Sequence, residues 1–378
     1  MNKIPVTVIT GFLGAGKTTL IRHLLTNSGG RRIAVLVNEF GEIGIDGDLL
    51  RSCQICSDDD SADTRAAASP ESPEMPNIVE LTNGCLCCTV QEEFLPTMQT
   101  LLRRRDQIDC IVIETSGLAL PQPLVRAFRW PEIRTQATVD SVVTVVDAEA
   151  IALGQVAQDR AALERQRQAD PSLDHETSIE DLFADQLACA DLVLLTKLDR
   201  LDTPEQASVQ RQLAARIAGG VGVIACSQGR ISPDVVLGLD AEVERYLDGR
   251  SHHDDGHDHH DHDHHGHDHD HDHDHDHGHD ERITSVEITL DNDVEPSQLI
   301  ARLQQLGKTH KLYRAKGFVN VPQKPMRLVL QGVGQRFDTF YDRPWQDGEL
   351  RQTRLILIGE QLDHQSVHSA VLRETSTV

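Results

Sequence analysis

The chain has 378 residues, of which 39% are hydrophobic and 25% are charged, and its formal net charge at pH 7 is −24. This composition is that of a folded protein, and at about 100–200 residues per domain the length predicts more than one domain. The acidic balance argues against the basic surface that proteins use to bind nucleic acids or anionic membranes.

Much of the negative charge lies in one segment. Residues 252–281 contain eleven Asp and one Glu, so the rest of the chain is only moderately acidic. The first apolar run, at residues 4–10, is too short for a signal sequence or a membrane span, and we expect a cytoplasmic protein. Eight cysteines are too few for a disulfide scaffold, and a reducing compartment favours metal or thiol chemistry wherever they cluster.

Apolar segments alternate with helical patterns through the first part of the chain. Residues 4–10 predict a buried strand, followed by a glycine-rich turn and a helix at about 17–27. Continuous apolar strands separated by helices predict an α/β fold with a mostly parallel sheet that is covered on both faces. Further strands are expected at 32–38, 77–81, 109–114, 139–146, 191–196 and 221–225.

Two polar segments divide the chain. Residues 57–76, rich in Ser, Asp, Ala and Pro, predict a mobile insertion, and the His/Asp/Gly tract at 249–282 buries no apolar surface and is predicted to be disordered without ligand. We therefore expect an α/β domain over 1–248, this linker, and a small α+β domain over 283–378. The last domain is predicted to contain strands at 284–290, 311–321, 326–332 and 353–359 and a helix near 297–306.

The glycine-rich turn has the sequence GFLGAGKT, residues 11–18, and matches the phosphate-binding pattern G-x-x-x-x-G-K-[ST] in full. It lies between a predicted strand and a predicted helix, as that loop requires; the alternative is a plain glycine turn. Lys17 is expected to reach the β and γ phosphates, and the Thr18 hydroxyl to bind Mg²⁺. The residues expected around the phosphates are Gly11, Gly14, Ala15, Gly16, Lys17, Thr18 and Thr19.

The segment TKLD, residues 196–199, predicts the base of the nucleotide. Its pattern, [NT]-K-x-D, places the carboxylate of Asp199 where it accepts hydrogen bonds from N1 and N2 of guanine, a donor pair that adenine lacks. Thr196 stands where Asn is more common, and Lys197 completes the pattern. Ser227, in the loop after the next strand, is expected over the base. The alternative is a charged turn after a strand.

Acidic residues follow two other strands. Glu114 and Gly117, in IVIETSG, occupy the positions of the second carboxylate and the mobile glycine near a γ-phosphate, so we expect Lys17, Glu114 and Gly117 to carry hydrolysis. The loop NEFGEIGID, residues 38–46, offers Glu39, Glu42 and Asp46. Two polar, glycine-punctuated segments at one phosphate site are typical of switches, and the alternative for the second is a solvated acidic loop.

Three thiols lie within four positions of ELTNGCLCCTV, residues 80–90. In an extended stretch Cys85 and Cys87 point to one face and Cys88 to the other. This spacing suits neither a disulfide nor a C-x-x-C redox pair, and a structural zinc site needs about four protein ligands. An under-filled site favours transient metal binding, with Glu39, Glu42, water or a thiol of the receiver completing it; redox and structural zinc are the alternatives.

Other metal-binding groups are less specific. Cys53 and Cys56 form a C-x-x-C half-site beside the predicted insertion, and the other three cysteines are expected to be buried small residues. Fifteen of the twenty histidines lie in residues 252–279, alternating with Asp. Imidazoles on a flexible chain suit Zn²⁺, Co²⁺, Ni²⁺ and Cu²⁺ without selecting among them, and the alternative is a solvated linker.

Together these motifs resemble the CobW family of P-loop GTPases, which is related to UreG and HypB. The matching segments cover most of the chain: GFLGAGKTTL, NEFGEIGIDG, ELTNGCLCCTV, ETSGLALPQPL, TKLD, the His-rich linker and the C-terminal domain. Within the family, stretches such as RAFRWPEIRTQATVDSVVTVVDAEAIA look like the cobalamin-biosynthesis branch. The departures are Thr196 and the insertion with its extra C-x-x-C.

The resemblance implies a GTP-hydrolysing metallochaperone that uses GTP and Mg²⁺, binds Co²⁺ at the C-x-C-C thiols and supplies it to a cobaltochelatase. Zinc delivery to a client enzyme is the alternative within the family, because Zn²⁺ binds N/S sites more tightly than Co²⁺. A metal buffer built on the His tract and a P-loop kinase are the other readings. No arginine finger is identifiable, so slow hydrolysis is expected without a partner.

Overall fold

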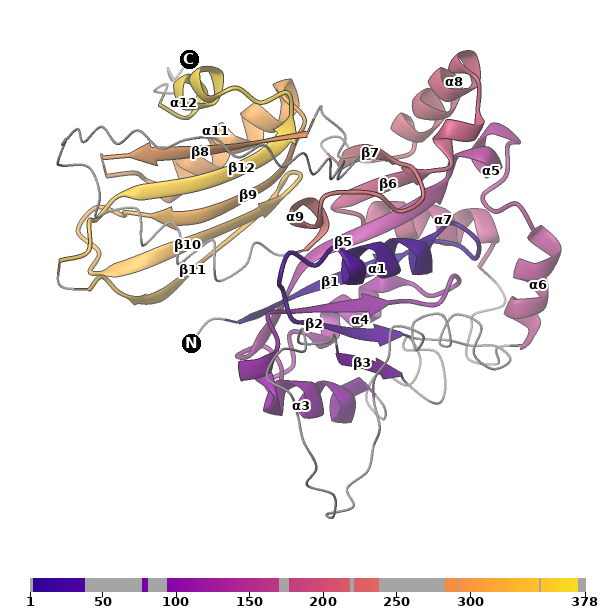
Figure 1. Ribbon diagram of the computed structural model, residues 1–378, viewed down its shortest axis with the longest axis horizontal. Coiled ribbons are helices and arrows are strands. Elements are labelled where there is room, and N and C mark those ends of the chain that lie inside the picture. Colours follow the sequence, from indigo (N-terminus) through magenta and orange to yellow (C-terminus); the bar gives the residue numbers. More distant parts are fainter. Residues whose placement is uncertain are drawn as a thin grey trace, which may run out of the picture.

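The computed structural model describes residues 3–37, 77–80, 94–169, 177–217, 221–237, 283–291, 293–346 and 348–372. Within these residues the chain forms two sheets, one of seven strands and one of five (Figure 1). The predicted insertion at 57–76 and the tract at 249–282 lie outside the described residues. The predicted domain boundaries therefore stay a prediction.

The seven-stranded sheet is parallel throughout, as the unbroken apolar strands predicted. Its strand order is β3-β2-β4-β1-β5-β6-β7. The connection after β1 leads toward β2 on one side, and the connection after β5 leads toward β6 on the other side. The strand order therefore changes direction between β1 and β5, next to the glycine-rich loop. Open parallel sheets bind ligands beyond the carboxyl ends of their strands at such a reversal. The strands are β1 (Ile4–Thr10), β2 (Ile33–Val37), β3 (Asn77–Glu80), β4 (Cys110–Glu114), β5 (Ala137–Asp147), β6 (Leu192–Thr196) and β7 (Gly222–Cys226).

Helices cover both faces of this sheet. On one face α1 packs Leu20, Ile21 and Leu24 over the central strands. On the other face two clusters form, one with α3 and α4 and the other with α5 to α8. The helices are α1 (Lys17–Thr26), α3 (Leu95–Arg103), α4 (Pro121–Ala127), α5 (Ala148–Ala152), α6 (Arg160–Ala169), α7 (Ile179–Ala188), α8 (Thr203–Ala214) and α9 (Pro233–Val236), with single 3₁₀ turns η2 (Arg105–Gln107) and η3 (Leu198–Arg200).

The five-stranded sheet is antiparallel, in the order β11-β10-β9-β12-β8, and packs one face against two helices. The sequence predicted four of its strands and one helix. It missed β11, whose polar sequence RFDTFYDRP suits an exposed edge strand, and it missed α12. The elements are β8 (Ile283–Leu290), α11 (Pro296–Thr309), β9 (Leu312–Val319), β10 (Met326–Val333), β11 (Arg336–Pro344), β12 (Thr353–Glu360) and α12 (His364–Leu372).

The two sheets share a hydrophobic core. Tyr313 and Ile358 of the C-terminal sheet belong to the same buried cluster as α1 and β5 to β7, and a Cβ at Gly222 would lie 2.8 Å from the Tyr313 ring. Figure 1 shows the C-terminal sheet standing beside the parallel sheet on the side of α9. The contact fixes one unit against the other through packed side chains.

Buried charges reinforce this contact. Arg314 is 2% exposed and forms an ion pair with Asp140 of β5, and its Nη1 donates to the Val235 carbonyl oxygen at 3.4 Å. Arg336 donates to Asp191 through Nε at 2.8 Å and Nη2 at 2.7 Å. Burial, and then the positive charges of neighbouring arginines, lower the pKa of Arg314 to about 9. The carboxylate of Asp140 therefore compensates a guanidinium that has lost its water.

Candidate functional site

The predicted phosphate loop connects β1 to α1 and has a backbone that only glycine adopts easily. Gly11, Gly14 and Gly16 have φ of 135°, 78° and 103°, in the region that a side chain disfavours. A Cβ on Gly11 would also lie 2.2 Å from the Val145 carbonyl oxygen. Gly16 is the N-cap of α1, so the first turn of that helix directs backbone N–H groups into the loop. This arrangement suits the binding of an anion such as a phosphate.

The loop brings Lys17 and Thr18 to the end of β4. The Thr18 hydroxyl donates to Glu114 Oε1 at 3.2 Å, and Lys17 Nζ lies 4.0 Å from the same oxygen and 3.4 Å from the Phe12 carbonyl oxygen. Lys17 and Glu114 are 7% and 6% exposed. A buried ammonium and a buried carboxylate therefore meet the hydroxyl of the half-buried Thr18 where the sequence predicted them, although 96 residues separate Thr18 from Glu114.

The donor set fits Mg²⁺. Hydroxyl and carboxylate oxygens are the ligands this ion prefers, and Mg²⁺ keeps several waters while it is held by one or two protein groups and a phosphate chain. Thr18 and Glu114 supply those two groups at one edge of the sheet. The residues that the described part of the chain presents here are consistent with a Mg²⁺-nucleotide.

Gly117 lies against the phosphate loop. A Cβ at this position would come 2.8 Å from the backbone nitrogen of Leu13 and 3.3 Å from the Phe12 carbonyl carbon. Gln186 of α7 holds the same segment from behind, because its Nε2 donates to the carbonyl oxygens of Gly117 at 3.1 Å and Ala119 at 3.2 Å. The structure thus brings Gly117 against the loop that carries Lys17, and adds Gln186 as a positioning residue that the sequence did not predict.

Substituting Gly117 tests this close approach. In a Gly117→Ala chain the segment must move away from the loop, because the atoms it meets are backbone and cannot rotate aside. We expect nucleotide hydrolysis to fall by about 100-fold, the cost of misplacing a reacting geometry by roughly 1 Å, while nucleotide binding changes by only a few-fold. Phosphate release at saturating GTP and binding of a fluorescent GTP analogue measure the two effects.

The matched control is Gly307→Ala, in α11. A Cβ there meets the flexible end of Gln335, which can move, so hydrolysis should stay at the wild-type rate. Equal loss of hydrolysis in both variants would contradict a specific role for Gly117.

The base motif is attached to the phosphate loop. The Thr196 hydroxyl lies 2.7 Å from the Ala15 carbonyl oxygen and 3.1 Å from the Val146 carbonyl oxygen, so Thr196 ties the end of β6 to both neighbours. Lys197 adopts a left-handed conformation, with φ of 57°, and its Nζ lies 2.5 Å from Asp147 Oδ2. Asp199 is exposed in η3.

Asp147 was missed by the sequence reasoning, which ended the strand at residue 146. Its carboxylate is 3% exposed and accepts from the backbone N–H groups of Glu149 and Ala150 while it pairs with Lys197. An acidic residue at the end of a buried strand, followed by a helical pattern, is the signal that indicates such a cap.

The Ser227 loop lies over the start of α1. Gln228 and Gly229 have φ of 51° and 73°, and a Cβ on Gly229 would lie 2.9 Å from the Thr19 carbonyl oxygen. Ser227 is exposed and forms an antiparallel bridge with Arg230. The two segments expected to bind the base, at 196–199 and 227–229, therefore each contact the phosphate loop or its helix, the first through Thr196 and the second through Gly229.

The described cysteines are Cys110, Cys189 and Cys226. Burial raises the pKa of the Cys226 thiol to about 12, and its Sγ donates to the Arg230 carbonyl oxygen at 3.5 Å. Cys110 is buried as expected, whereas Cys189 is only half-buried at the end of α7. Among the described residues there is no group of three or more His, Cys, Asp or Glu side chains arranged to hold a metal ion.

The residues predicted to bind the transition metal fall outside the described residues. They are Glu39, Glu42, Cys85, Cys87 and Cys88. Asp46 of the acidic loop and the Cys53 and Cys56 pair lie outside them as well. The strands that precede them are described, and Val37, the last residue of β2, is paired with Glu80 on one side and with Glu114 on the other. The chain therefore leaves β2 and β3 at the sheet edge where Glu114 stands.

No helix in the described ranges has the length and apolar character to span a membrane. The relatives that match over nearly the full length include three zinc chaperones. The chain is 50% identical to the zinc chaperone CobW of Pseudomonas aeruginosa, over 97% of this chain and 90% of that protein. It is 44% identical to the zinc chaperone CobW of a Sinorhizobium species, over 98% and 97% of the two chains. It is 30% identical to the zinc chaperone YjiA of Escherichia coli, over 98% of each.

Family models match both the part of the chain that forms the parallel sheet and the part that forms the C-terminal antiparallel sheet. Residues 5–224 match the nucleotide-binding domain described as CobW/HypB/UreG, and residues 283–373 match the C-terminal domain of the cobalamin synthesis protein cobW. The first match covers nearly all of the parallel sheet, the phosphate loop, and Glu114, whose carboxylate accepts from Thr18 of that loop. The chain belongs to the CobW/HypB/UreG family, with the C-terminal domain of its CobW branch.

Proposed function

We propose that this chain is a GTP-hydrolysing metallochaperone in which bound nucleotide controls the affinity of a thiolate site for a transition-metal ion. The observation that carries the proposal is the position of Glu114. Its carboxylate bonds to Thr18 of the phosphate loop, and its backbone is paired with the last residue of β2, after which the segment with Glu39 and Glu42 begins. A change at the γ-phosphate would therefore act at the sheet edge from which the chain runs on, in sequence, to the proposed metal ligands.

The nucleotide half of the proposal assigns a role to each group. Lys17 and the N–H groups of the loop bind the phosphates, and Asp199 selects guanine. Thr18 and Glu114 would hold Mg²⁺, which would neutralise negative charge on the phosphates. Water attacks the γ-phosphorus, the bond from that phosphorus to the β–γ bridging oxygen breaks, and GDP and phosphate leave. Gly117 gives the γ-phosphate a backbone contact that is lost after hydrolysis.

The metal half rests on Cys85, Cys87 and Cys88 with Glu39 and Glu42. Thiolates suit Zn²⁺, and at an N/S site Zn²⁺ binds more tightly than Co²⁺. The relatives named as zinc chaperones support zinc as the ion carried. Delivery of Co²⁺ to a cobaltochelatase, which only the family resemblance implies, stays a prediction, and the experiment below compares Co²⁺ with Zn²⁺ in parallel. We place the delivery in the cytoplasm.

A competition titration tests the coupling. Zn²⁺ and Co²⁺ are each titrated against a chromogenic chelator with the protein bound to a non-hydrolysable GTP analogue, bound to GDP, and free of nucleotide. We expect one metal equivalent to bind about 5- to 150-fold more tightly with the GTP analogue than with GDP, the usual range of coupling between sites. Coupling is reciprocal, so bound metal must tighten GTP binding by the same factor.

Two variants control the titration. A Cys85→Ser/Cys87→Ser chain should lose the tight equivalent and keep nucleotide binding, whereas Lys17→Ala should keep the thiols and lose the nucleotide dependence. Equal metal affinities in all three nucleotide states of the wild-type chain would end the switch proposal.

The fifteen histidines of residues 252–279 favour a second candidate function, metal buffering. Deleting residues 252–279 distinguishes metal delivery by a chaperone from metal buffering. A chaperone retains one tight nucleotide-dependent equivalent after the deletion, and a buffer loses most of its capacity.

A further inference from the structure

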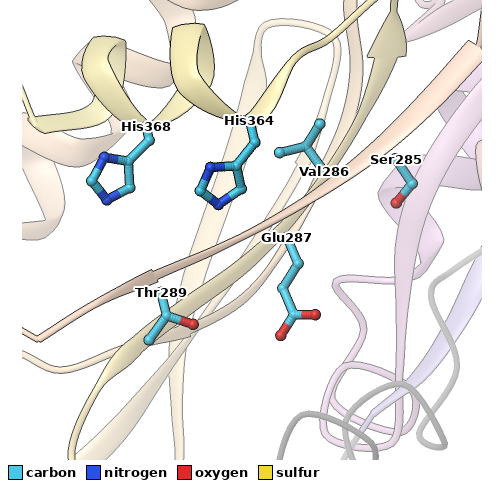
Figure 2. Close-up of a pocket in the computed structure, with 6 residues that line it drawn as sticks. All are labelled: Ser285, Val286, Glu287, Thr289, His364 and His368. Carbon is cyan, nitrogen blue, oxygen red and sulfur yellow. The ribbon is translucent and has the colours of Figure 1, made fainter.

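The helix α12 carries two histidines that the proposed function does not use. His364 and His368 are four residues apart, the spacing that places two side chains on one face of a helix. His364 is exposed and His368 is half-buried, and their rings are stacked, with centroids 5.7 Å apart and planes inclined by 16°. Figure 2 shows both imidazoles on the same side of α12, directed toward β8. Two nitrogen donors are therefore presented together to solvent.

The helix holds this pair in place. Val367 and Val371 are fully buried beneath α12, and the Asp363 carboxylate accepts from the Ser366 backbone N–H at 2.8 Å, which caps the first turn. Arg302 of α11 donates to the Val371 carbonyl oxygen at 2.8 Å and fixes the other end. The spacing of the two rings thus belongs to a docked helix, and donors on a rigid element lose little freedom when they bind a ligand.

The space beside the rings has room for an ion and its waters. A pocket of about 510 Å³ is lined by His364 and His368 and by residues of β8, among them Ser285, Glu287 and Thr289. In Figure 2 the Glu287 carboxylate points away from both rings, so the two imidazoles are the donors on which the site rests. Water or another exchanging donor must fill the remaining coordination positions.

We propose that His364 and His368 chelate a divalent transition-metal ion at the surface of the C-terminal sheet. Two imidazoles bound at about 2.0–2.1 Å from one ion need nitrogens roughly 3 Å apart. Rotation about the broad terminal torsion of each histidine brings stacked rings to that geometry at little cost. Once one ring binds, the second is tethered at high effective concentration, so the pair binds more tightly than either ring alone.

The choice of ion follows from the donors. Imidazole suits Zn²⁺, Ni²⁺ and Cu²⁺, with Co²⁺ weaker than Ni²⁺, whereas Mg²⁺ prefers oxygen. The site is independent of the proposed GTPase function, because it needs neither nucleotide nor thiols. If the chain is a metallochaperone, the pair gives its C-terminal unit a weak cargo site, and β8, which lines the pocket, begins one residue after the His/Asp tract ends.

Residue-resolved chemical modification of the full chain tests the pair without interference from other metal sites. Diethyl pyrocarbonate acylates accessible imidazole nitrogens, and mass spectrometry of the peptide containing α12 reports its two histidines separately. With NiCl₂ or ZnCl₂ in excess over all histidines, at about tenfold above the dissociation constant, we expect both rings to be modified about tenfold more slowly. MgCl₂ should have no effect, and His310, on α11's C-terminal side, serves as the internal reference.

Two variants decide whether the pair acts as a chelate. In His368→Gln the protection of His364 should disappear, because one exposed imidazole binds weakly. In Gln365→His/His368→Gln the chain keeps two histidines at adjacent positions, which do not face one another on a helix, and protection should again be lost. Protection of His364 that survives either change, or no protection in the wild-type chain, would overturn the proposal.

A third chain separates this inference from the proposed function. In Cys85→Ser/Cys87→Ser, tested without nucleotide, protection at α12 should be unchanged. Loss of protection there would show that the effect at α12 depends on the thiols, and would also overturn an independent site.

Discussion

Replacing Asp140 with Asn is expected to lower the free energy of unfolding by about 3–5 kcal/mol, the cost of removing one partner from a buried ion pair. The change keeps the shape of the side chain and removes its charge. Arg314 is then left 2% exposed between the two sheets, with the Val235 carbonyl oxygen as a weak acceptor at 3.4 Å. Urea unfolding followed by circular dichroism measures the loss.

Two further chains identify the cause. Asp140→Leu combined with Arg314→Met removes both charges and should recover much of the lost stability, because an apolar pair of similar volume needs no compensation. Glu180→Gln breaks a surface pair with Arg160, whose side chains are 58% and 53% exposed, and should cost under about 1 kcal/mol. Similar losses for Asp140→Asn and Glu180→Gln would contradict the assignment of a buried pair.

Changing Asp199 to Asn is expected to weaken GTP binding by about 10²- to 10⁴-fold. The carboxylate is proposed to accept two hydrogen bonds, from N1–H and the N2 amino group of guanine, and each charge-assisted bond contributes roughly 1.5–3 kcal/mol. An amide at this position can donate one hydrogen bond, which suits xanthine, since xanthine has a carbonyl oxygen in place of the amino group. Affinity for xanthosine triphosphate should therefore rise as affinity for GTP falls.

Nucleotide affinities measured by isothermal calorimetry with GTP, xanthosine triphosphate and ATP test the exchange. Asp106→Asn is the matched control, because Asp106 is an exposed carboxylate in η2, before β4 and so at the opposite edge of the sheet. It should leave all three affinities unchanged. A loss of GTP affinity in Asp199→Asn without a gain for xanthosine triphosphate would show that Asp199 does not read the base.

The sequence predicted the local parts of this site because each has a pattern of adjacent residues. The glycines at 11, 14 and 16 signal their own unusual backbone, and unbroken apolar strands signal a parallel sheet, which in turn places Thr18 beside Glu114. Gln186 could not be predicted in this way. It lies on a helix and holds a loop 69 residues earlier in the chain, so only the packed structure relates the two.

The same limit applies to the contact between the sheets. Arg314 appears in the sequence as one of several basic residues in a mostly apolar run, where a surface position is the usual expectation for arginine. Its burial beside Asp140 depends on how β9 docks against β5. The edge strand β11 was missed for a related reason, because half-exposed strands have polar sequences and depend on their neighbours for stability.

The approach of Tyr313 to Gly222 has a consequence for how such chains diverge. Any side chain larger than hydrogen at 222 would enter the space of the aromatic ring, since even a Cβ lies 2.8 Å from it. The two positions belong to different units, yet a bulkier residue at one requires a smaller residue at the other. The C-terminal sheet is therefore not an exchangeable module, and natural variants should change the two positions as a pair or not at all.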